Sequence, residues 1–320
     1  MVPLTTATLT LPLIAALATA GVAIDRRFGE PRRAHPLVAF GNVAKYIETQ
    51  LNTGRRGRLK GLFAWGLAVL PPVLIAAWLV AVLPFILACA VHVALLWFAL
   101  GARSLDDHIA PIARALAQRN LVEARLLTAR IVSRETAHAD EAALSRAAVE
   151  SALENGNDAI FGALFWFAIA GGPGALAFRL ANTLDAMWGY RTPRYLRFGW
   201  AAARIDDVLN WIPARLTAAS YALLGDTRTA LRCWQEQARR WDSPNAGPVM
   251  AAGAGSLNVL LGGAAVYHGT LEQRPTLGAG QPASAAHVMA ALHLVQRSVI
   301  LWLAVLIVLA LLSVPFQGQV

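Results

Sequence analysis

The sequence has little charge, almost no cysteine and almost no lysine. Charged residues make up only 15% of its 320 positions. A soluble domain has roughly 25%, so an ordinary soluble protein is excluded. The two cysteines, Cys89 in an apolar run and Cys233 in a polar segment, argue against a disulfide framework or a cysteine-based metal site. Neither a Walker A motif nor a nucleic-acid recognition module is present, so we expect no nucleic-acid partner.

Long runs without charge indicate several membrane-spanning helices in a chain that is 57% hydrophobic. Residues 61–102 and 298–320 contain no Asp, Glu, Lys or Arg, and about 18 apolar residues are enough to mark a candidate transmembrane helix. The first run is long enough for two crossings. We therefore expect spans near 61–82 and 84–102, joined by a tight turn at Leu83–Pro84, and a last span near 298–316.

The apolar run at residues 4–24 is a further candidate span. It contains Ala18-Thr19-Ala20, which is similar to a signal-peptidase site. A signal peptide begins with basic residues, whereas here the first basic residue is Arg26 and the basic cluster follows the run. This order favours a retained first span near 4–24, with its N-terminus outside.

The basic residues are almost all arginine, and their placement orients the chain. Of 28 basic residues, 26 lie in segments 25–60, 103–158 and 179–242, and only Arg274 and Arg297 lie elsewhere. Basic segments favour the cytoplasmic side of a membrane. All three can be cytoplasmic only if residues 159–178 do not cross fully, and Gly171-Gly172-Pro173-Gly174 interrupts that run.

The predicted fold is therefore all-α: a single polytopic membrane domain with about four transmembrane helices and a cytoplasmic helical body. Segments 103–158 and 179–242 form that body. Residues 159–178 and the uncharged, glycine-rich residues 243–271 are expected to be re-entrant or broken hairpins, and residues 272–286 a loop. Irregular backbone at membrane depth requires surrounding protein or a water-filled cavity.

A group of carboxylates precedes the first of these hairpins. Glu150, Glu154 and Asp158 are spaced four apart, so on a helix they share one face. Because hard cations prefer carboxylate oxygens, this face is a candidate Mg²⁺ site. The alternative is a solvated helix face that ends at a membrane boundary.

Two further faces carry the same three residue types. Arg179, Asn182 and Asp185 fall three apart, Arg204, Asp207 and Asn210 repeat that spacing, and Asp206 joins Asn210 at four apart. One interpretation is salt bridging on a helix surface. The other is that both faces meet across one cleft at the cytoplasmic membrane surface, where arginines neutralise phosphate and aspartates hold Mg²⁺ or orient an amine.

The order of short motifs resembles the adenosylcobinamide-phosphate synthase family of cobalamin biosynthesis, the CobD/CbiB membrane proteins. The matching residues extend over most of the chain: Asp25 with Gly29-Glu30-Pro31 and His35-Pro36; Arg130 with Val132, Arg134 and Thr136; Arg146-Ala147 with Val149-Glu150; Glu154-Asn155 with Asp158; Asn182-Thr183-Leu184-Asp185 with Met187 and Gly189-Tyr190; Phe198-Gly199 with Ala203-Arg204; Asp206-Asp207 with Asn210; Ile212-Pro213-Ala214-Arg215-Leu216-Thr217; and Ser243-Pro244-Asn245-Ala246-Gly247. The chain departs from the family pattern at Gly156-Asn157 and at Pro248-Val249.

The resemblance implies an ATP-dependent amide ligation at the cytoplasmic face of the cell inner membrane. A corrinoid acid, adenosylcobyric acid, is joined to aminopropanol or its O-phosphate. The implied cofactors are ATP and Mg²⁺, and the implied partners are membrane lipid and other enzymes of the late cobalamin pathway. Activation by ATP through an acyl phosphate calls for donors to developing charge and for a group that takes the ammonium proton.

The sequence supplies candidates for each of these roles. The candidate catalytic residues are Glu154, Asp158, Asp206, Asp207 and His35. The candidate substrate-binding residues are Arg134, Arg179, Asn182, Asp185, Arg204, Asn210, Arg215 and Asn245, and the candidate Mg²⁺ ligands are Glu150, Glu154 and Asp158.

Two other functions remain open. A transporter of an amphiphilic anion is one, because broken helices with polar residues line transport sites. A non-catalytic membrane sensor or regulator with the same fold is the other, and the two altered loops favour it.

Overall fold

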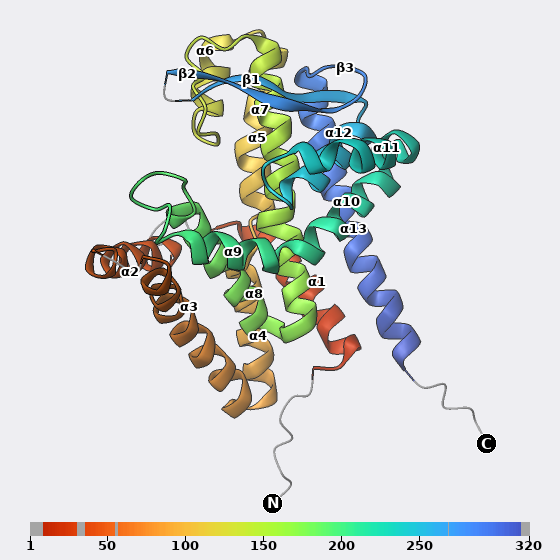
Figure 1. Cartoon of the computed structure of the whole chain (residues 1–320). Helices are drawn as coiled ribbons and strands as arrows, with labels where there is room; N and C mark the ends of the chain where they lie inside the picture. Colours follow the sequence, from red (N-terminus) through yellow and green to blue (C-terminus); the bar gives the residue numbers. More distant parts are fainter. Residues whose placement is uncertain (1–8, 31–35, 55–56, 268, 315–320) are drawn as a thin grey trace, which may run out of the picture. The chain divides into compact units, whose positions relative to one another are not determined.

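The structure is a computed structural model that describes residues 9–30, 36–54, 57–267 and 269–314. It is mostly helical, as predicted (Figure 1). By its internal contacts the chain forms two compact units. The first comprises residues 1–101, 162–209 and 302–320, and the second comprises residues 102–161 and 210–301.

In its described residues, the first unit contains helices and no strand. They are α1 (Leu11–Phe28), α2 (Pro36–Leu51), α3 (Gly57–Val82), α4 (Phe85–Ala99), α8 (Gly162–Trp188), α9 (Trp200–Leu209) and the last part of α13 (Ala285–Ser313). The turn between α3 and α4 falls at Leu83–Pro84, where the sequence predicted it, because Pro84 lacks the N–H that a continuing helix needs.

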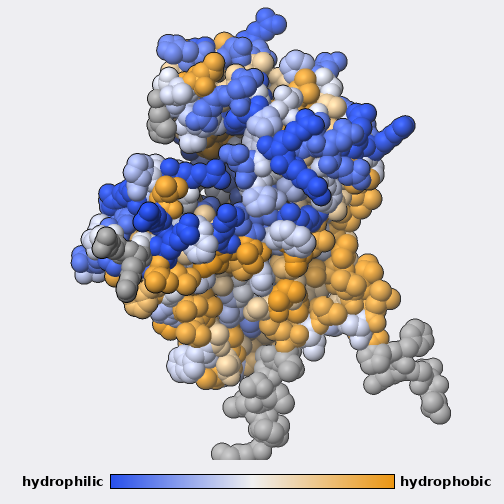
Figure 2. All heavy atoms as spheres, viewed as in Figure 1, coloured by the Kyte–Doolittle hydropathy of each residue, from blue (hydrophilic) through white to orange (hydrophobic). Residues whose placement is uncertain are grey.

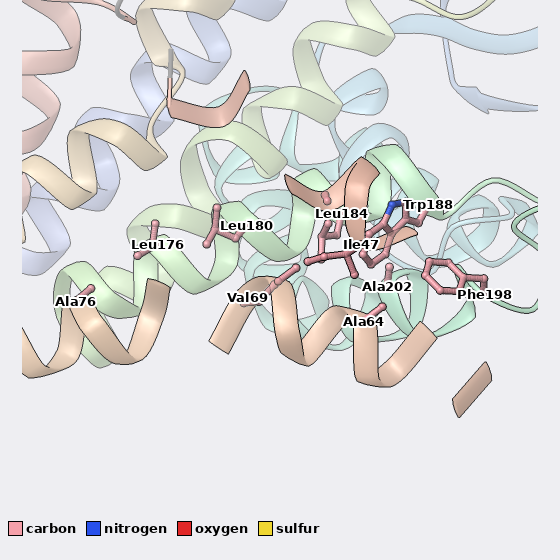
Figure 3. Close-up of a cluster of buried hydrophobic side chains, with 12 residues drawn as sticks. Ile47, Ala64, Val69, Ala76, Leu176, Leu180, Leu184, Trp188, Phe198 and Ala202 are labelled. Atoms are coloured by element: carbon pink, nitrogen blue, oxygen red, sulfur yellow. The ribbon is translucent and has the colours of Figure 1, made fainter. Parts of the chain in front are cut away.

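The core of the first unit lies between α3 and α8 (Figure 3). Helix α3 contributes small residues, Ala64, Ala68 and Ala76, which recur at multiples of four and so share one face. Opposite them, α8 contributes large residues at the same spacing: Leu176, Leu180, Leu184 and Trp188. Small residues on one helix let the neighbouring backbone approach closely, which is how helices pack tightly in membranes.

The other face of α3 is apolar and exposed. Phe63, Leu74 and Trp78 are each more than half exposed, and Figure 2 shows a hydrophobic surface over this helix. A soluble monomer rarely exposes an apolar surface of this extent. Four helical runs in the described residues are long and apolar enough to span a membrane: Gly57–Val82, Phe85–Ala117, Glu141–Trp188 and Ala285–Ser313.

The predicted spans near 61–82, 84–102 and 298–316 fall within three of these runs. The span predicted near 4–24 does not appear among them. Its helix begins at Leu11 within the described residues and reaches the charged residues Asp25, Arg26 and Arg27. The fourth run is Glu141–Trp188, whose uncharged part is residues 159–178.

Helix α8 is broken at the predicted glycines. Ala170 and Gly171 have non-helical backbone angles, and Gly171 has φ +62°, a conformation that favours glycine. The chain reverses there, because the Phe178 ring lies against Gly162 with no room for a Cβ atom. In an uninterrupted helix these residues would be about 24 Å apart. The Gly172 N–H donates to His92 Nδ1 (2.8 Å) at the reversal. The depth of this hairpin in a membrane stays a prediction.

The second unit combines helices with a small sheet. Its helices are α5 (Ala102–Ala117), α6 (Leu121–Thr128), α7 (Glu141–Gly156), the π-helical turn η1 (Asn157–Phe161), α10 (Trp211–Leu224), α11 (Thr227–Gln237), the 3-10 turn η2 (Ala238–Arg240), α12 (Ala246–Ser256) and the first part of α13. Strand β1 (Val259–Tyr267) pairs antiparallel with β2 (Thr270–Gly278) and parallel with β3 (Gln281–Pro282).

This sheet corrects the prediction for residues 243–286. The structure forms a short buried helix, α12, followed by a β-hairpin, in place of a broken apolar helix and a loop. The strand signal was hidden because the pairing of β1 with β2 shifts between Leu261 and Gly263. A bulge of this kind interrupts the alternation of buried and exposed residues by which a strand is recognised.

Candidate functional site

The second unit contains a cavity of about 460 Å³ beneath its β-hairpin. This volume suits a small ligand. The lining residues come from the segment after α6, from α7, from the segment before α12, from α12 itself, and from β1 and β2; Figure 1 shows where these elements lie in the chain. The lining residues are Ile131, Val132, Ser133, Arg134, Ala147, Glu150, Ser151, Glu154, Asn155, Trp241, Asp242, Met250, Tyr267, Glu272, Gln273, Arg274 and Pro275.

Glu150 is the charged centre of this cavity wall. Its side chain is only 3% exposed and pairs with two arginines. Arg274 donates from Nη1 to Oε2 (3.0 Å) and from Nη2 to Oε1 (3.2 Å), and Arg134 donates from Nη2 to Oε2. The Gly262 N–H donates to Oε1 (2.7 Å). A carboxylate buried to this degree needs such partners, because an unpaired buried charge is strongly destabilising.

Two consecutive glycines bring the β-hairpin to Glu150. Gly262 and Gly263 have φ of +75° and +72°, which side-chain-bearing residues rarely adopt. A Cβ on Gly262 would lie 2.0 Å from the Pro275 carbonyl oxygen. The bulge aims the Gly262 N–H at Glu150 and places Arg274 opposite Gly263 in the register. Glycine at both positions is therefore what allows the hairpin to supply two partners to one carboxylate.

Sequence reasoning missed Arg274 as a site residue. It lies in a segment that the sequence predicts to be a loop, and its partner is 124 residues away. One signal was available. Arg274 is one of only two basic residues outside the three basic segments, so positive-inside topology does not explain it.

The two carboxyl groups of α7 that face the cavity have opposite electrostatic character. Both lie N-terminal to the apolar hairpin. Burial by itself would raise the pKa of Glu150, but the charges and hydrogen bonds of Arg134 and Arg274 outweigh it and hold the pKa below its usual value. Burial, and then the charge of Glu150, raise the pKa of Glu154 to about 7, against the smaller opposing effect of the two arginines. Glu154 therefore changes charge near neutral pH.

The expected Mg²⁺ site of three carboxylates does not form. In the described part of the chain, no three His, Cys, Asp or Glu side chains gather closely enough to hold a metal ion. The charges of two arginines hold Glu150, and the Asn157 amide donates to Asp158 Oδ1 (2.8 Å). The π-helical turn at Asn157–Phe161 also interrupts the α-helical spacing on which the expectation rested.

Three other predicted residues of the second unit belong to a polar network around α10. The Asn157 amide also donates to Asn210 Oδ1 (2.9 Å). Arg215 lies over the Trp211 ring, and its Nη1 donates to Asn245 Oδ1 (2.9 Å) while its Nη2 donates to the Pro244 carbonyl oxygen (3.1 Å). In the structure, therefore, Arg215 and Asn245 connect α10 to the segment before α12.

The remaining predicted residues lie in the first unit, on α8 and α9, which pack together. The Asn182 amide donates to Asp206 Oδ1 (3.3 Å), so the two helices do meet through predicted polar residues. A Cβ on Gly189 would lie 2.0 Å from Asp185 Oδ1, so the backbone passes close to that carboxyl group.

The arginines of these two faces have different partners. Arg179 pairs with Glu30 (3.6 Å). Arg204 is 65% exposed and pairs with Asp207 of its own helix (3.5 Å). The local ion pair that was one of the two interpretations is therefore present at α9. Asn210 belongs to the second unit, so the face of Arg204, Asp207 and Asn210 is divided between the units. His35 lies outside the described residues.

Of the predicted residues, the cavity brings together Arg134, Glu150 and Glu154. It adds Arg274, Trp241, Asp242, Tyr267 and Glu272, which the sequence did not single out.

Comparisons with known proteins show which family the chain is similar to. A model of the CobD/Cbib protein family matches residues 18–295. A cobalamin biosynthesis protein CobD from Stutzerimonas stutzeri is 58% identical over 286 residues, which cover 89% of this chain and 94% of that protein. The proteins of the same name from Chromobacterium violaceum and Mycobacterium tuberculosis are 52% identical over 296 residues and 41% identical over 279 residues. These matches cover 90% and 86% of this chain, and 94% and 88% of the two relatives. No solved structure matches the chain significantly.

Proposed function

The chain belongs to the CobD/Cbib protein family, and we propose that it acts in cobalamin biosynthesis as an adenosylcobinamide-phosphate synthase. Relatives that carry the name cobalamin biosynthesis protein CobD match this chain over 94% of their own length. The reaction is the formation of an amide between the carboxylate of adenosylcobyric acid and the amino group of aminopropanol or its O-phosphate.

The observation that carries this proposal in the structure is the pair of carboxyl groups on α7. Glu150 is held ionised between Arg134 and Arg274, and Glu154 lies next to it with a pKa of about 7. An amine must lose a proton before it can attack a carboxyl carbon. The best proton acceptor at a given pH is a group whose pKa lies near that pH. Glu154 has that property, and its burial is the main cause, followed by the charge of Glu150.

Each residue of the cavity then has a part in the reaction. Glu154 takes the proton from the bound ammonium group. Glu150 acts as a positioning residue, because its charge raises the pKa of Glu154 and its carboxylate holds the two arginines. Arg134 and Arg274 border the same cavity and hold the Glu150 carboxylate in place beside Glu154.

A carboxylate does not react with an amine unless it is activated. We propose that ATP supplies this activation and makes the carboxyl carbon electrophilic. The cavity itself does not suit a triphosphate, because four of its lining side chains are carboxylic and only two are guanidinium groups. A magnesium ion that accompanies ATP commonly takes one or two protein carboxylates and completes its shell with phosphates and water. Such an ion therefore needs no cluster of three carboxylates.

We place the protein in the cell inner membrane as a multi-pass protein with the active face in the cytoplasm. The four long apolar helical runs support a membrane protein. The side follows from the basic segments 25–60, 103–158 and 179–242. Contact with other enzymes of the late cobalamin pathway, whose substrates are also amphiphilic corrinoids, fits the same location.

A genetic test separates the proposed enzyme from a transporter or a sensor. A strain that lacks this amide-forming step is supplied with cobyric acid and transformed with the gene for this chain. The proposal predicts cobalamin-dependent growth. A transporter or a sensor leaves the missing amide bond unmade, so absence of growth with the protein present in the membrane contradicts the proposal.

A further inference from the structure

The acidic side chains of the second-unit cavity outnumber its basic ones. Glu150, Glu154, Asp242 and Glu272 line it, against Arg134 and Arg274. Glu150 pairs with both arginines, and the other carboxyl groups that line the same space are Glu154, Asp242 and Glu272, of which Asp242 has a partner of its own. Within the described residues, Glu154 has neither a hydrogen-bond partner nor an ion-pair partner, although its side chain is only partly exposed. The lining as a whole favours a ligand that carries positive charge.

Aromatic side chains reinforce this preference. The Arg274 guanidinium lies over one face of the Trp241 ring, with its carbon 5.4 Å from the ring centroid, which leaves the opposite face for a ligand cation. Tyr267, at the end of β1, borders the same cavity. Rings combined with carboxylates are a common way to recognise an amine, whereas a polyanion gains nothing from either.

We propose that this cavity is the subsite for the amine substrate: a small primary ammonium compound whose nitrogen lies on Glu154, in the field of Asp242 and Glu272. The inference rests on the proposed function and adds to it which substrate the cavity takes. It also assigns roles to Trp241, Asp242 and Glu272, none of which was a candidate from the sequence.

The chemical step balances with the groups that the proposal names. The ammonium nitrogen gives one proton to the Glu154 carboxylate and becomes a neutral amine. Its lone pair forms the C–N bond at the carboxyl carbon that ATP has activated, and the bond from that carbon to its oxygen leaving group breaks. The nitrogen then gives its second proton to the leaving group or to water, and Glu154 releases the first proton to solvent.

Steady-state kinetics of the full chain in detergent test which substrate the cavity binds. The variants are Asp242→Asn, Glu272→Gln and the pair together, because each removes a charge and keeps the shape. The control is Glu236→Gln on α11, an exposed carboxylate of the same unit outside the cavity. The double variant is expected to raise the KM for the amine at least tenfold, with the KM values for ATP and the corrinoid acid within twofold of the parent.

Two outcomes overturn the inference. A rise in the KM for ATP, with the amine KM unchanged, makes the cavity a nucleotide site. Values within twofold for all substrates, as for Glu236→Gln, mean that no substrate binds there.

A binding measurement keeps the inference separate from the proposed function. Aminopropanol and its O-phosphate are each titrated into the parent and into Glu154→Gln without ATP, by calorimetry, with matched circular dichroism to show that both are folded. Binding to the parent that weakens at least tenfold in Glu154→Gln supports the ammonium site, even if the parent makes no amide. Equal binding to both proteins overturns it, even if the parent makes the amide.

Discussion

Arg274 and Glu150 form a two-pronged ion pair between residues 124 positions apart, with Nη1–Oε2 and Nη2–Oε1 distances of 3.0 Å and 3.2 Å. The pair joins the β-hairpin to α7, the helix that also carries Glu154. Both partners are largely buried, with 14% and 3% of their side chains exposed. A bidentate pair fixes the orientation of both groups as well as their distance. The Arg274–Glu150 pair, together with Arg134, therefore fixes the shape of this cavity wall.

Removing the charge of Glu150 is predicted to destabilise the protein. In Glu150→Gln, the buried arginines Arg134 and Arg274 lose their shared carboxylate. Breaking a buried pair from one side costs roughly 3–5 kcal/mol. The matched control is Asp107→Asn, which breaks the exposed pair with Arg103 and costs about 0.2–1 kcal/mol. Thermal unfolding in detergent measures both, and similar midpoints for the two variants would show that the buried pair does not stabilise the fold.

Arg274→Lys is predicted to impair the reaction while keeping the charge. Lysine cannot reproduce the fork that holds both oxygens of Glu150. Misplacement of the groups around a reacting centre by about 1 Å costs about a hundredfold, so we expect kcat/KM for the amine to fall between about tenfold and a hundredfold. Arg103→Lys, on the exposed pair, is the control. Equal kinetics for the two variants would mean that the geometry at Glu150 is not used.

The affinity for the amine is predicted to depend on pH through Glu154. Its pKa is raised to about 7 by burial and by Glu150, while Arg134 and Arg274 act in the opposite direction. Above that pH the carboxylate form predominates and attracts an ammonium group, and an aliphatic amine keeps its proton until about pH 10. The KM for the amine should therefore fall as the pH rises from about 6 to about 8. Glu154→Gln should abolish this dependence, and the same profile in that variant would assign the titration to another group.

The exposed pair on α9 is predicted to matter little for the reaction. Arg204 and Asp207 lie 3.5 Å apart, and Arg204 is 65% exposed. An exposed i,i+3 pair contributes only about 0.3 kcal/mol to the stability of the protein. Arg204→Lys and Asp207→Asn should therefore form the amide within threefold of the parent. If either variant forms the amide a hundredfold or more slowly than the parent, the result would instead support the cleft between the two Arg/Asn/Asp faces that the sequence suggested.

The features predicted correctly from the sequence depend on local signals. The turn at Pro84 and the break at Gly171 follow from what proline and glycine do to a helix. The shared face of Glu150 and Glu154 follows from α-helical spacing. Asp158 lies in a π-helical turn, where α-helical spacing no longer predicts which face a residue occupies. Helices α8 and α9 contact each other through Asn182 and Asp206, whereas the meeting of the Arg179-Asn182-Asp185 face with the Arg204-Asp207-Asn210 face stays a prediction.

The features that were missed depend on distant contacts. The β-hairpin escaped detection because its two-glycine bulge breaks the strand alternation. Arg274 could not be paired with Glu150 until the hairpin was known. Glu154 could not be distinguished from Glu150 for the same reason: burial raises the pKa of both carboxyl groups, and at Glu150 the charges and hydrogen bonds of the two arginines outweigh it.

The most direct test of the proposed function is amide formation by the purified protein. The full chain in detergent is incubated with adenosylcobyric acid, aminopropanol O-phosphate, ATP and Mg²⁺, and the corrinoid product is identified by mass spectrometry. We predict adenosylcobinamide phosphate from the parent, and a rate lower by about a hundredfold or more in Glu154→Gln, since a positioned acid or base commonly contributes 10²–10⁴-fold. A folded parent protein that forms no corrinoid amide under these conditions would contradict the proposed function, and a Glu154→Gln variant as fast as the parent would contradict the role of Glu154.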